Sequence, residues 1–464
     1  MTVNIKILIF CGVNDIISIM EKTIATISTP LGKGAIAIVR MSGEKAKSIA
    51  LDIFSAKNLT TENISARYMY FGKLNLGDGA FEECLMVYFK APFSYTGEDL
   101  IEFQVHGGVL LAQKVLEKCL SAGASLAEPG EFSKRAFLNG QITLDKAEAI
   151  VGEINAESEG ELKNSLKITN GTLAEKILEE QDKLKYMLAE LEVGMDYPDE
   201  VEELNLKLNI KGRLKKIADE NEILLKNSQY STYLKNGINV ALVGKTNVGK
   251  SSIMNALLGQ DRAIVTDIQG TTRDSICESF LYKGVKINVI DTAGIRKTND
   301  LVESIGIEKS LKSIETADLV LFVLDGSERL DDEDKELLRL VENKKHLIVI
   351  NKADKVRKID KFENEISISA LKNENIEKLK DKIFNMVISE EFDMNSLAIT
   401  NERQTQILKD AQKQIEDILT NNTLSLDILT MLVKDIWKTL GKITGNTENE
   451  DIIDLIFSKF CLGK

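Results

Sequence analysis

The chain contains the glycine loop Gly244-Lys245-Thr246-Asn247-Val248-Gly249-Lys250-Ser251, which has the pattern G-x-x-x-x-G-K-S. An apolar run, residues 238–243, precedes the loop, and a series of helix formers, residues 252–258, follows it. A buried strand, a glycine loop and a helix in this order are the context in which the pattern wraps around phosphate groups. Lys250 would reach the β- and γ-phosphates and Ser251 would ligate Mg²⁺, while the helix N-terminus adds its positive end. We therefore predict a phosphate-binding loop made by Asn247, Val248, Gly249, Lys250, Ser251 and Ser252.

Three further motifs stand at the ends of apolar runs downstream of this loop. The first reads Asp291-Thr292-Ala293-Gly294; its aspartate can hold the Mg²⁺ shell through water, and its glycine N–H can meet the γ-phosphate. The second reads Asn351-Lys352-Ala353-Asp354, and its last carboxylate can accept from guanine N1–H and the 2-amino group, which adenine does not offer. The third reads Ser369-Ala370-Leu371 and would supply a backbone N–H to guanine O6.

A polar segment between the loop and Asp291 completes the set, and it reads Thr266-Asp267-Ile268-Gln269-Gly270-Thr271-Thr272-Arg273-Asp274. Thr272 would complete the Mg²⁺ shell. Each motif alone is common, since an N-K-x-D tetrapeptide is usually a polar turn and D-T-A-G is often only a strand end. All five in this order and spacing predict a domain that binds GTP with Mg²⁺.

Two residues indicate how GTP hydrolysis would be assisted. Ile295 follows D-T-A-G at the position where Ras-like GTPases carry the glutamine that orients water. Isoleucine cannot polarise water, so another group has to do so. Asn247 and residues 266–271 offer oxygen atoms suited to K⁺, which would neutralise developing charge as an arginine finger does. From the residue alone, a loop-stabilising role for Asn247 is an equally good interpretation.

The composition is that of a soluble globular protein with several domains, since 43% of the 464 residues are hydrophobic and 28% are charged. The five cysteines form no C-x-x-C pair, which argues against a disulfide framework or zinc knuckle and favours a reducing, cytoplasmic location. No run of about eighteen apolar residues occurs, so we expect no membrane span. The net charge of −13 argues against strong non-specific nucleic-acid binding by this chain alone.

The residue pattern divides the chain into five segments. Residues 1–19 hold a short, interrupted apolar run without a cleavage site, and Met20 is a natural start, so we interpret them as an extension or a misplaced start. Residues 20–138 form an α+β domain. In it we expect strands at residues 23–28, 34–40, 84–90 and 100–105, and helices at residues 44–54 and 107–119.

The remaining three segments are of two kinds, helix-rich and mixed strand and helix. Residues 139–235 and 387–464 are helix-rich, whereas residues 236–386 alternate strands and helices around the nucleotide motifs. We therefore predict a multidomain protein of the α/β and α classes. In this interpretation, a P-loop GTPase domain with a doubly wound sheet is inserted into a helical domain behind the N-terminal α+β domain.

Several strings together resemble one family. They are the P-loop with asparagine at its fourth position, I-V-T-D-I-x-G-T-T-R-D at 264–274, D-T-A-G-I-R at 291–296, F-C-L-G-K at 460–464, S-Y-T-G-E-D at 94–99 and P-G-E-F-S-K-R-A-F-L-N at 129–139. Over residues 20–464 the chain resembles the MnmE (TrmE) family of tRNA-modifying GTPases. The N-terminal and C-terminal strings are the specific ones, because many GTPases share the P-loop and N-K-x-D motifs.

The resemblance implies a three-part protein with an N-terminal domain akin to the tetrahydrofolate-binding fold of aminomethyltransferases. It implies a homodimer formed through these N-terminal domains, and a heterotetramer with the flavin-dependent partner MnmG (GidA), which carries FAD. The two proteins would add an aminomethyl or carboxymethylaminomethyl group to C5 of the wobble uridine of certain tRNAs. The one-carbon unit would come from 5,10-methylenetetrahydrofolate, with 5-formyltetrahydrofolate as an alternative ligand.

The resemblance also assigns roles to residues of the GTPase segment. K⁺ would be held by Asn247, Thr266, Ile268 and Thr271, and Mg²⁺ by Ser251 and Thr272. Glu303 matches the family's catalytic glutamate, which orients the attacking water indirectly; without the resemblance, it would be interpreted as a solvated helix charge. The family's GTPase domains pair across the dimer around K⁺. Hydrolysis would therefore not require a glutamine at the position of Ile295.

For folate, the family's pocket positions correspond to Arg40, Glu102 and Lys464. A carboxylate suits the pterin N–H groups, and cations suit the glutamate tail or a ring carbonyl. Gln141 stands where the family often has lysine, so it can donate a hydrogen bond without charge. Cys461 belongs to the C-terminal motif, and nucleophile, redox thiol and packing group all stay open for it.

Two other functions fit part of the sequence. One is a ribosome-assembly GTPase switch, whose nucleotide domain would look nearly the same but which adds a basic RNA-binding domain. The other is a folate-dependent aminomethyltransferase that acts on a metabolite and carries a regulatory GTPase domain. Residues 20–138 contain equal numbers of basic and acidic residues, which favours the tRNA-modifying GTPase over the ribosome-assembly switch.

Overall fold

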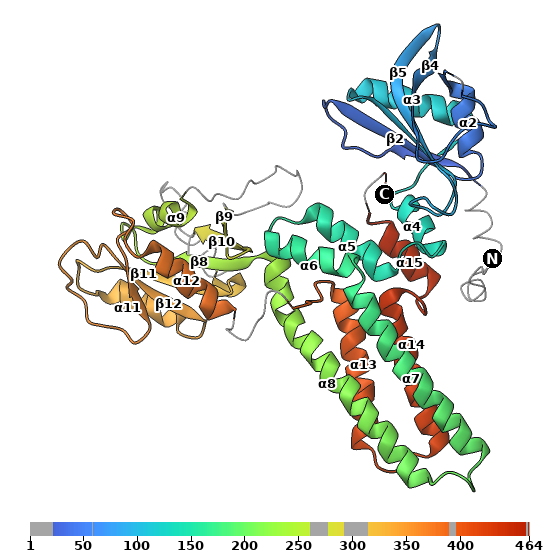
Figure 1. Ribbon diagram of the computed structural model, residues 1–464. Coiled ribbons are helices and arrows are strands. Elements are labelled where there is room, and N and C mark those ends of the chain that lie inside the picture. The colour runs from blue at the N-terminus through green and yellow to red at the C-terminus, as the bar shows by residue number, and fades with distance from the viewer. Residues whose placement is uncertain are drawn as a thin grey trace. The chain divides into compact units, whose positions relative to one another are not determined.

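The computed structural model describes residues 22–57, 59–259, 277–291, 314–388, 396–460 and 463 (Figure 1). The chain forms two compact units. The first contains Met1–Val151, Ile168–Ile217 and Ile407–Lys464, and the second contains Gly152–Lys167 and Ala218–Gln406. Each unit therefore combines segments that are distant in the sequence.

The first unit contains a seven-stranded sheet in the order β3-β4-β5-β6-β2-β1-β7, antiparallel except where β1 meets β7. The strands are β1 (Ile24–Ile27), β2 (Ile36–Ser42), β3 (Phe54–Ala56), β4 (Met69–Gly77), β5 (Ala80–Phe89), β6 (Leu100–His106) and β7 (Ser125–Leu126). The helices are α2 (Ala46–Ile53), α3 (Val109–Ser121) and α4 (Glu131–Leu138). This arrangement confirms the predicted α+β character of the N-terminal part.

Side chains alternate between the two faces of the sheet along β2 and β6, and this alternation determines which of them point away from the core. On β2, Val39 and Met41 are buried, and on β6 Phe103 is buried, so these side chains share the face that packs against the core. The strand period of two directs Arg40 and Glu102 to the opposite face. The two residues are direct partners in the antiparallel register of β2 and β6.

Helices form the rest of the first unit. They are α5 (Leu144–Asn155), α6 (Glu159–Thr169), α7 (Thr172–Asp196), α8 (Glu203–Asn236), α13 (Glu402–Thr420), α14 (Leu426–Thr444) and α15 (Glu450–Phe457). Of these, α5, α6, α8 and α13 are divided between the two units. Figure 1 shows α7 alongside α14, where Gln181 donates to the Trp437 carbonyl at 2.9 Å. A Cβ at Gly441 would lie 2.6 Å from the same Gln181 amide nitrogen, so glycine permits this close approach. The C-terminal helix α14 thus supplies packing that α7 needs.

The second unit contains a six-stranded sheet in the order β13-β12-β11-β8-β10-β9, parallel except between β9 and β10. The strands are β8 (Ile238–Val243), β9 (Cys277–Tyr282), β10 (Val285–Asp291), β11 (Leu319–Asp325), β12 (His346–Asn351) and β13 (Glu365–Ser367). The helices that follow strands are α9 (Lys250–Leu258), α11 (Asp332–Val341) and α12 (Ile376–Val387). All seven residues of β11 are buried, as expected for a central strand covered on both faces. The predicted doubly wound sheet is confirmed.

Candidate functional site

The glycine loop connects β8 to α9 and is shaped by three residues with positive φ. Gly244, Asn247 and Gly249 have φ angles of 153°, 64° and 97°. A Cβ at Gly244 would lie 2.3 Å from the Val323 carbonyl oxygen, and one at Gly249 would lie 2.2 Å from the Asn351 side-chain nitrogen. The glycines are therefore needed where the loop rests on β11 and β12, in addition to their conformational freedom.

The first turn of α9 provides the charge that phosphates require. Gly249 is its N-cap, so the N–H groups of Lys250, Ser251 and Ser252 have no acceptor within the helix. Ser251 and Ser252 are exposed. The Lys250 ammonium bends back over the loop and donates to the carbonyl oxygens of Gly244 at 2.5 Å and Lys245 at 2.7 Å. These groups form an anion site of the kind that helix N-termini provide.

Asn351 joins the glycine loop to the segment predicted to contact the base. Its side-chain nitrogen donates to the Val248 carbonyl at 2.8 Å, and its side-chain oxygen accepts from the Ala370 N–H at 3.2 Å. Only 2% of Asn351 is exposed. The phosphate part and the base part of the site are thus held in one arrangement by a single buried amide.

Lys352 makes a second connection to the same loop. Its ammonium donates to the Asn247 carbonyl at 3.0 Å and pairs with Asp325 at 2.5 Å. Burial alone would raise the pKa of Asp325, but the hydrogen bonds from Lys352 and Ser327 hold it below its ordinary value. The positive φ of Asn247 is therefore stabilised by an ion-paired lysine.

Asp354 is the predicted acceptor for the guanine base. The Ser369 hydroxyl donates to its carboxylate at 2.7 Å, and this hydrogen bond lowers the pKa of Asp354 below its ordinary value. The carboxylate is therefore ionised at neutral pH and can accept two N–H groups. Ser369 is buried and Leu371 is exposed, in the segment that follows β13.

Sequence reasoning missed an ion-pair cluster beside the loop. Lys245 pairs with Asp331 at 2.6 Å and with Asp334 at 2.8 Å, and these two aspartates also form the capping box that begins α11. Burial alone would lower the pKa of Lys245, but both ion pairs raise it. A cavity of about 230 Å³ lies here, lined by the acidic residues Asp325, Glu328, Glu333 and Asp334 and by the basic residues Lys245, Arg329 and Lys352. We assign the phosphates to the N-terminus of α9, because the N–H groups of its first turn have no acceptor within the helix.

Many predicted site residues lie outside the described part of the chain. They are Thr266, Asp267, Ile268, Gln269, Gly270, Thr271, Thr272, Thr292, Ala293, Gly294, Glu303, Cys461 and Lys464. The backbone of Asp291 is described: it ends β10 and is paired in register with Leu242 of β8, one residue before Val243 ends that strand. This backbone position is close to where the glycine loop begins.

A second group of predicted residues meets in the first unit. The Arg40 guanidinium bonds the Glu102 carboxylate through Nε and Nη2, both at 2.8 Å, and Nη1 donates to the Gly463 carbonyl at 3.3 Å. A Cβ at Gly463 would lie 2.8 Å from Ser28 Cα, so Gly463 itself rests against the end of β1. Gly463 thus contacts Arg40 through its carbonyl, while the predicted residues Cys461 and Lys464 on either side of it lie outside the described residues.

Two aromatic residues flank Arg40, and sequence reasoning did not assign them. The guanidinium carbon lies 5.6 Å from the centre of the Tyr95 ring and 5.8 Å from that of Phe132. Both distances are in the range of cation–π attraction. Gln141 lies beside Gly97, where a Cβ would be 3.1 Å from its amide nitrogen. Tyr95 and Phe132 belong to the strings S-Y-T-G-E-D and P-G-E-F-S, so the sequence did contain a signal for them.

A phosphate loop fixed to an N-K-x-D motif at the carboxyl ends of parallel strands defines the class: the chain is a P-loop GTPase. Models of two family domains also match it, the "GTP-binding protein TrmE N-terminus" over residues 23–141 and the "MnmE helical domain" over residues 144–461. The tRNA modification GTPase MnmE of Clostridioides difficile is 41% identical over 457 residues, covering 96% of this chain and all of the relative. Its counterpart from Thermotoga maritima is 42% identical over 456 residues, 95% of this chain and all of that relative.

The chain therefore belongs to the MnmE family of tRNA modification GTPases. Membership of a GTPase family implies binding of GTP with Mg²⁺. Among solved structures, the G domain of the FeoB iron transporter of T. maritima is 31% identical, covers 32% of this chain and 99% of that chain, and has a TM-score of 0.26. None of the helices in the described ranges is both long and apolar enough for a membrane crossing.

Proposed function

We propose that this chain hydrolyses GTP to drive modification of the wobble uridine of certain tRNAs, together with the flavin-dependent partner MnmG (GidA). The two proteins would add an aminomethyl or carboxymethylaminomethyl group to C5 of that uridine. The observation that carries the proposal is the presence of two sites in one chain: a nucleotide site in the second unit, and the Arg40–Glu102 pair with its aromatic neighbours in the first. Full-length similarity to proteins named for tRNA modification supports it.

In the nucleotide site, the chain's own groups bind and stabilise charge. Lys250 and the first N–H groups of α9 would surround the phosphates and stabilise negative charge as water attacks the γ-phosphorus and GDP leaves. Ser251 and Thr272 would hold Mg²⁺, with Asp291 acting through water; the ion would neutralise charge on the β- and γ-phosphate oxygens. We assign the orientation of the water to Glu303, because Ile295 offers no polar group.

Hydrolysis is proposed to depend on K⁺ held by Asn247 with Thr266, Ile268 and Thr271. The exposed side chain of Asn247 and the fixing of its carbonyl by Lys352 support this assignment. Replacing K⁺ by Na⁺ at constant ionic strength should therefore slow hydrolysis by about a hundredfold, the smaller end of what loss of a charge-stabilising group costs. A phosphate-release assay measures this, and equal rates in both salts would contradict the assignment.

In the first unit, we propose a site for 5,10-methylenetetrahydrofolate or 5-formyltetrahydrofolate. The Glu102 carboxylate suits the pterin N–H groups, while Arg40, Gln141 and Lys464 would bind a ring carbonyl or the glutamate tail. The donor set fits the ligand because charged groups lie next to the rings of Tyr95 and Phe132, which offer apolar walls to a flat heterocycle.

A homodimer through the N-terminal domain is part of the proposal. The outer face of β4 presents Met69 and Phe71, which are 52% and 66% exposed, and the half-buried Leu85 of β5 is the register partner of Phe71. Apolar side chains that gather on one sheet face are typical of an interface, and a second copy of the chain is the simplest partner.

Mass analysis of tRNA nucleosides from a deletion strain tests the proposed function. We expect the modified wobble uridine to disappear and to return when the gene is restored. Normal wobble uridines with defective ribosomes would instead support a ribosome-assembly switch. Normal wobble uridines with an altered one-carbon metabolite would support an aminomethyltransferase that acts on a small molecule.

A further inference from the structure

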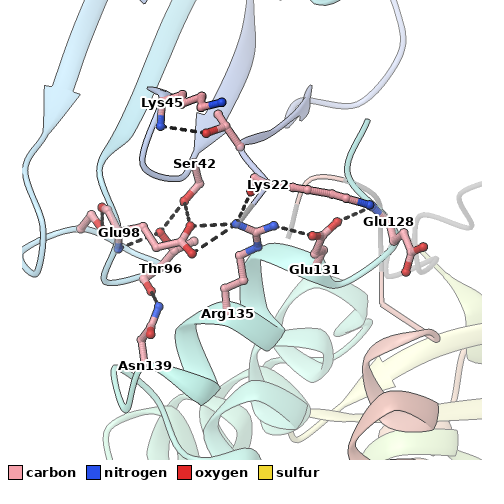
Figure 2. Close-up of polar contacts among 11 residues, drawn as sticks. Lys22, Ser42, Lys45, Thr96, Glu98, Glu128, Glu131, Arg135 and Asn139 are labelled. Atoms are coloured by element: carbon pink, nitrogen blue, oxygen red, sulfur yellow. Dashed lines mark hydrogen bonds and ion pairs between the residues drawn. The ribbon is translucent and has the colours of Figure 1, made fainter. Parts of the chain in front are cut away.

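Arg135 on α4 is fully buried and is held by an unusual number of partners (Figure 2). Its Nη1 donates to the Lys22 carbonyl at 2.9 Å and to both Glu98 carboxylate oxygens, at 3.1 and 3.2 Å. Its Nη2 donates to Glu131 at 2.7 Å. A buried guanidinium is stable only when such pairing is extensive, so the surroundings of Arg135 have one well-defined arrangement.

The carboxylate of Glu98 extends this network into the loop between β5 and β6. The Ser42 hydroxyl donates to Glu98 at 2.7 Å and lies 2.7 Å from the Thr96 hydroxyl. From the other side, the Asn139 amide donates to the Thr96 carbonyl at 2.7 Å. Figure 2 shows these side chains converging between the loop and α4. The network thereby fixes residues 94–99 against α4.

The two segments joined in this way carry the aromatic neighbours of Arg40. Tyr95 belongs to the loop, and Phe132 belongs to α4, three residues before Arg135. The Tyr95 hydroxyl lies 2.8 Å from the hydroxyl of the buried Ser133, also on α4. The separation of the two aromatic rings therefore depends on how α4 is held against residues 94–99.

We propose that Arg135, acting through Glu98 and Glu131, is a positioning residue that sets the spacing of Tyr95 and Phe132 around Arg40 and so shapes the ligand site. This inference rests on the proposed folate site. The forked guanidinium can bond two carboxylates and a carbonyl at once, which the single ammonium of lysine cannot do in the same geometry. Removing one carboxylate leaves Arg135 in place but relaxes the loop that carries Tyr95.

The test compares binding of 5-formyltetrahydrofolate to the full-length wild type and to Glu98→Gln by calorimetry. We expect about tenfold weaker binding, the lower end of what loss of an outer supporting contact costs at preorganised sites. Glu82→Gln is the matched control, because it removes the same charge from a carboxylate that is about as buried as Glu98 but bonds His106 instead. The GTP hydrolysis rate should be unchanged in both variants, which shows that the second unit is intact.

A double-mutant cycle separates positioning from general stability. In a Tyr95→Leu background the ring that Glu98 helps to place is absent, so Glu98→Gln should weaken binding no further. An additive effect would overturn the inference, as would wild-type affinity in Glu98→Gln. Failure of the wild type to bind would remove the folate site itself, and the inference with it. Should Glu98→Gln fold poorly, Ser42→Ala, which removes a hydroxyl that donates to Glu98, provides the same comparison.

Discussion

At the scale of single residues, Asp354 is the group proposed to select guanine. Its carboxylate is ionised and oriented by the Ser369 hydroxyl, and it can accept the guanine N1–H and 2-amino group. Asp354→Asn should weaken GTP binding about 10- to 150-fold, since a hydrogen bond to a charged group contributes about 1.5–3 kcal/mol. Competition binding measures this.

The same substitution has an internal control. Asparagine offers one acceptor and one donor, which matches the N1–H and 2-carbonyl of xanthine, so binding of xanthosine triphosphate should improve. If GTP and xanthosine triphosphate lose affinity equally, the variant has damaged the site without changing its base recognition, and Asp354 does not select the base.

Asp145, near the start of α5, gives a prediction about pH. It is fully buried, neither oxygen of its carboxyl has a hydrogen-bond partner among the described residues, and burial raises the pKa of this carboxyl above the ordinary 3.8. The folded chain therefore holds this proton more tightly than the unfolded chain. Its contribution to stability is present at low pH and is lost as the pH rises from 3.8 through the raised pKa.

Asp145→Asn should consequently raise the stability of the first unit at pH 7 and change it little at pH 4. Urea unfolding at the two pH values, followed by circular dichroism, measures the difference. An equal effect at both pH values would show that titration of Asp145 has no part in stability.

At the scale of elements, the turn between β9 and β10 contacts the beginning of α6 in the second unit. The Gly160 N–H donates to the Gly284 carbonyl at 3.0 Å, and Lys286 pairs with Glu157. A Cβ at Gly160 would lie 2.6 Å from the same carbonyl oxygen. Gly160→Ala should therefore destabilise the second unit by about 1–3 kcal/mol, as overpacking does.

Thermal unfolding tests this prediction, because the transition that GDP raises reports the second unit. Gly212→Ala in α8 is the matched control: nothing lies within 4 Å of a Cβ there, so the exchange should lower no transition. A wild-type midpoint for Gly160→Ala would mean that the contact between α6 and the turn is loose.

Alternation of apolar residues predicted several elements of the first unit, with ends shifted by a few residues. The strands expected at 34–40 and 100–105 are β2 (Ile36–Ser42) and β6 (Leu100–His106). Strand β4 (Met69–Gly77) was not predicted. Gly72 interrupts its pattern because a Cβ there would lie 2.3 Å from the Ser55 carbonyl oxygen, a constraint that only the paired strand β3 imposes.

The parts of the candidate sites that lie within the nucleotide motifs were predictable from the sequence, whereas contacts between other distant segments were not. The partners of Asn351 and Lys352 follow from motifs at the ends of neighbouring parallel strands. The motif strings contain Tyr95 and Phe132, but their cation–π contacts with Arg40 depend on how residues 94–99 pack against α4, which no spacing in the sequence encodes. The same reason explains why the ion pairs of Lys245 with the start of α11 were missed.

At the scale of the whole molecule, the apolar face of β4 is expected to hold two copies together. Phe71→Glu should convert the dimer to a monomer, because a charge would be buried at the interface without a partner. Sedimentation velocity measures the change, and GTP binding should be retained. Tyr186→Glu on α7, an equally exposed aromatic, should leave the dimer intact. A dimeric Phe71→Glu variant would place the interface elsewhere.

The central claim is that GTP hydrolysis by this chain drives modification of wobble uridine in tRNA. The most direct test is mass spectrometry of wobble nucleosides from a deletion strain that carries either the wild-type gene or Lys250→Ala. We expect the modified uridine with the wild-type gene and its absence with Lys250→Ala, because that lysine is proposed to stabilise the phosphates during hydrolysis. Full modification with Lys250→Ala, or unchanged nucleosides in the deletion strain itself, would contradict the claim.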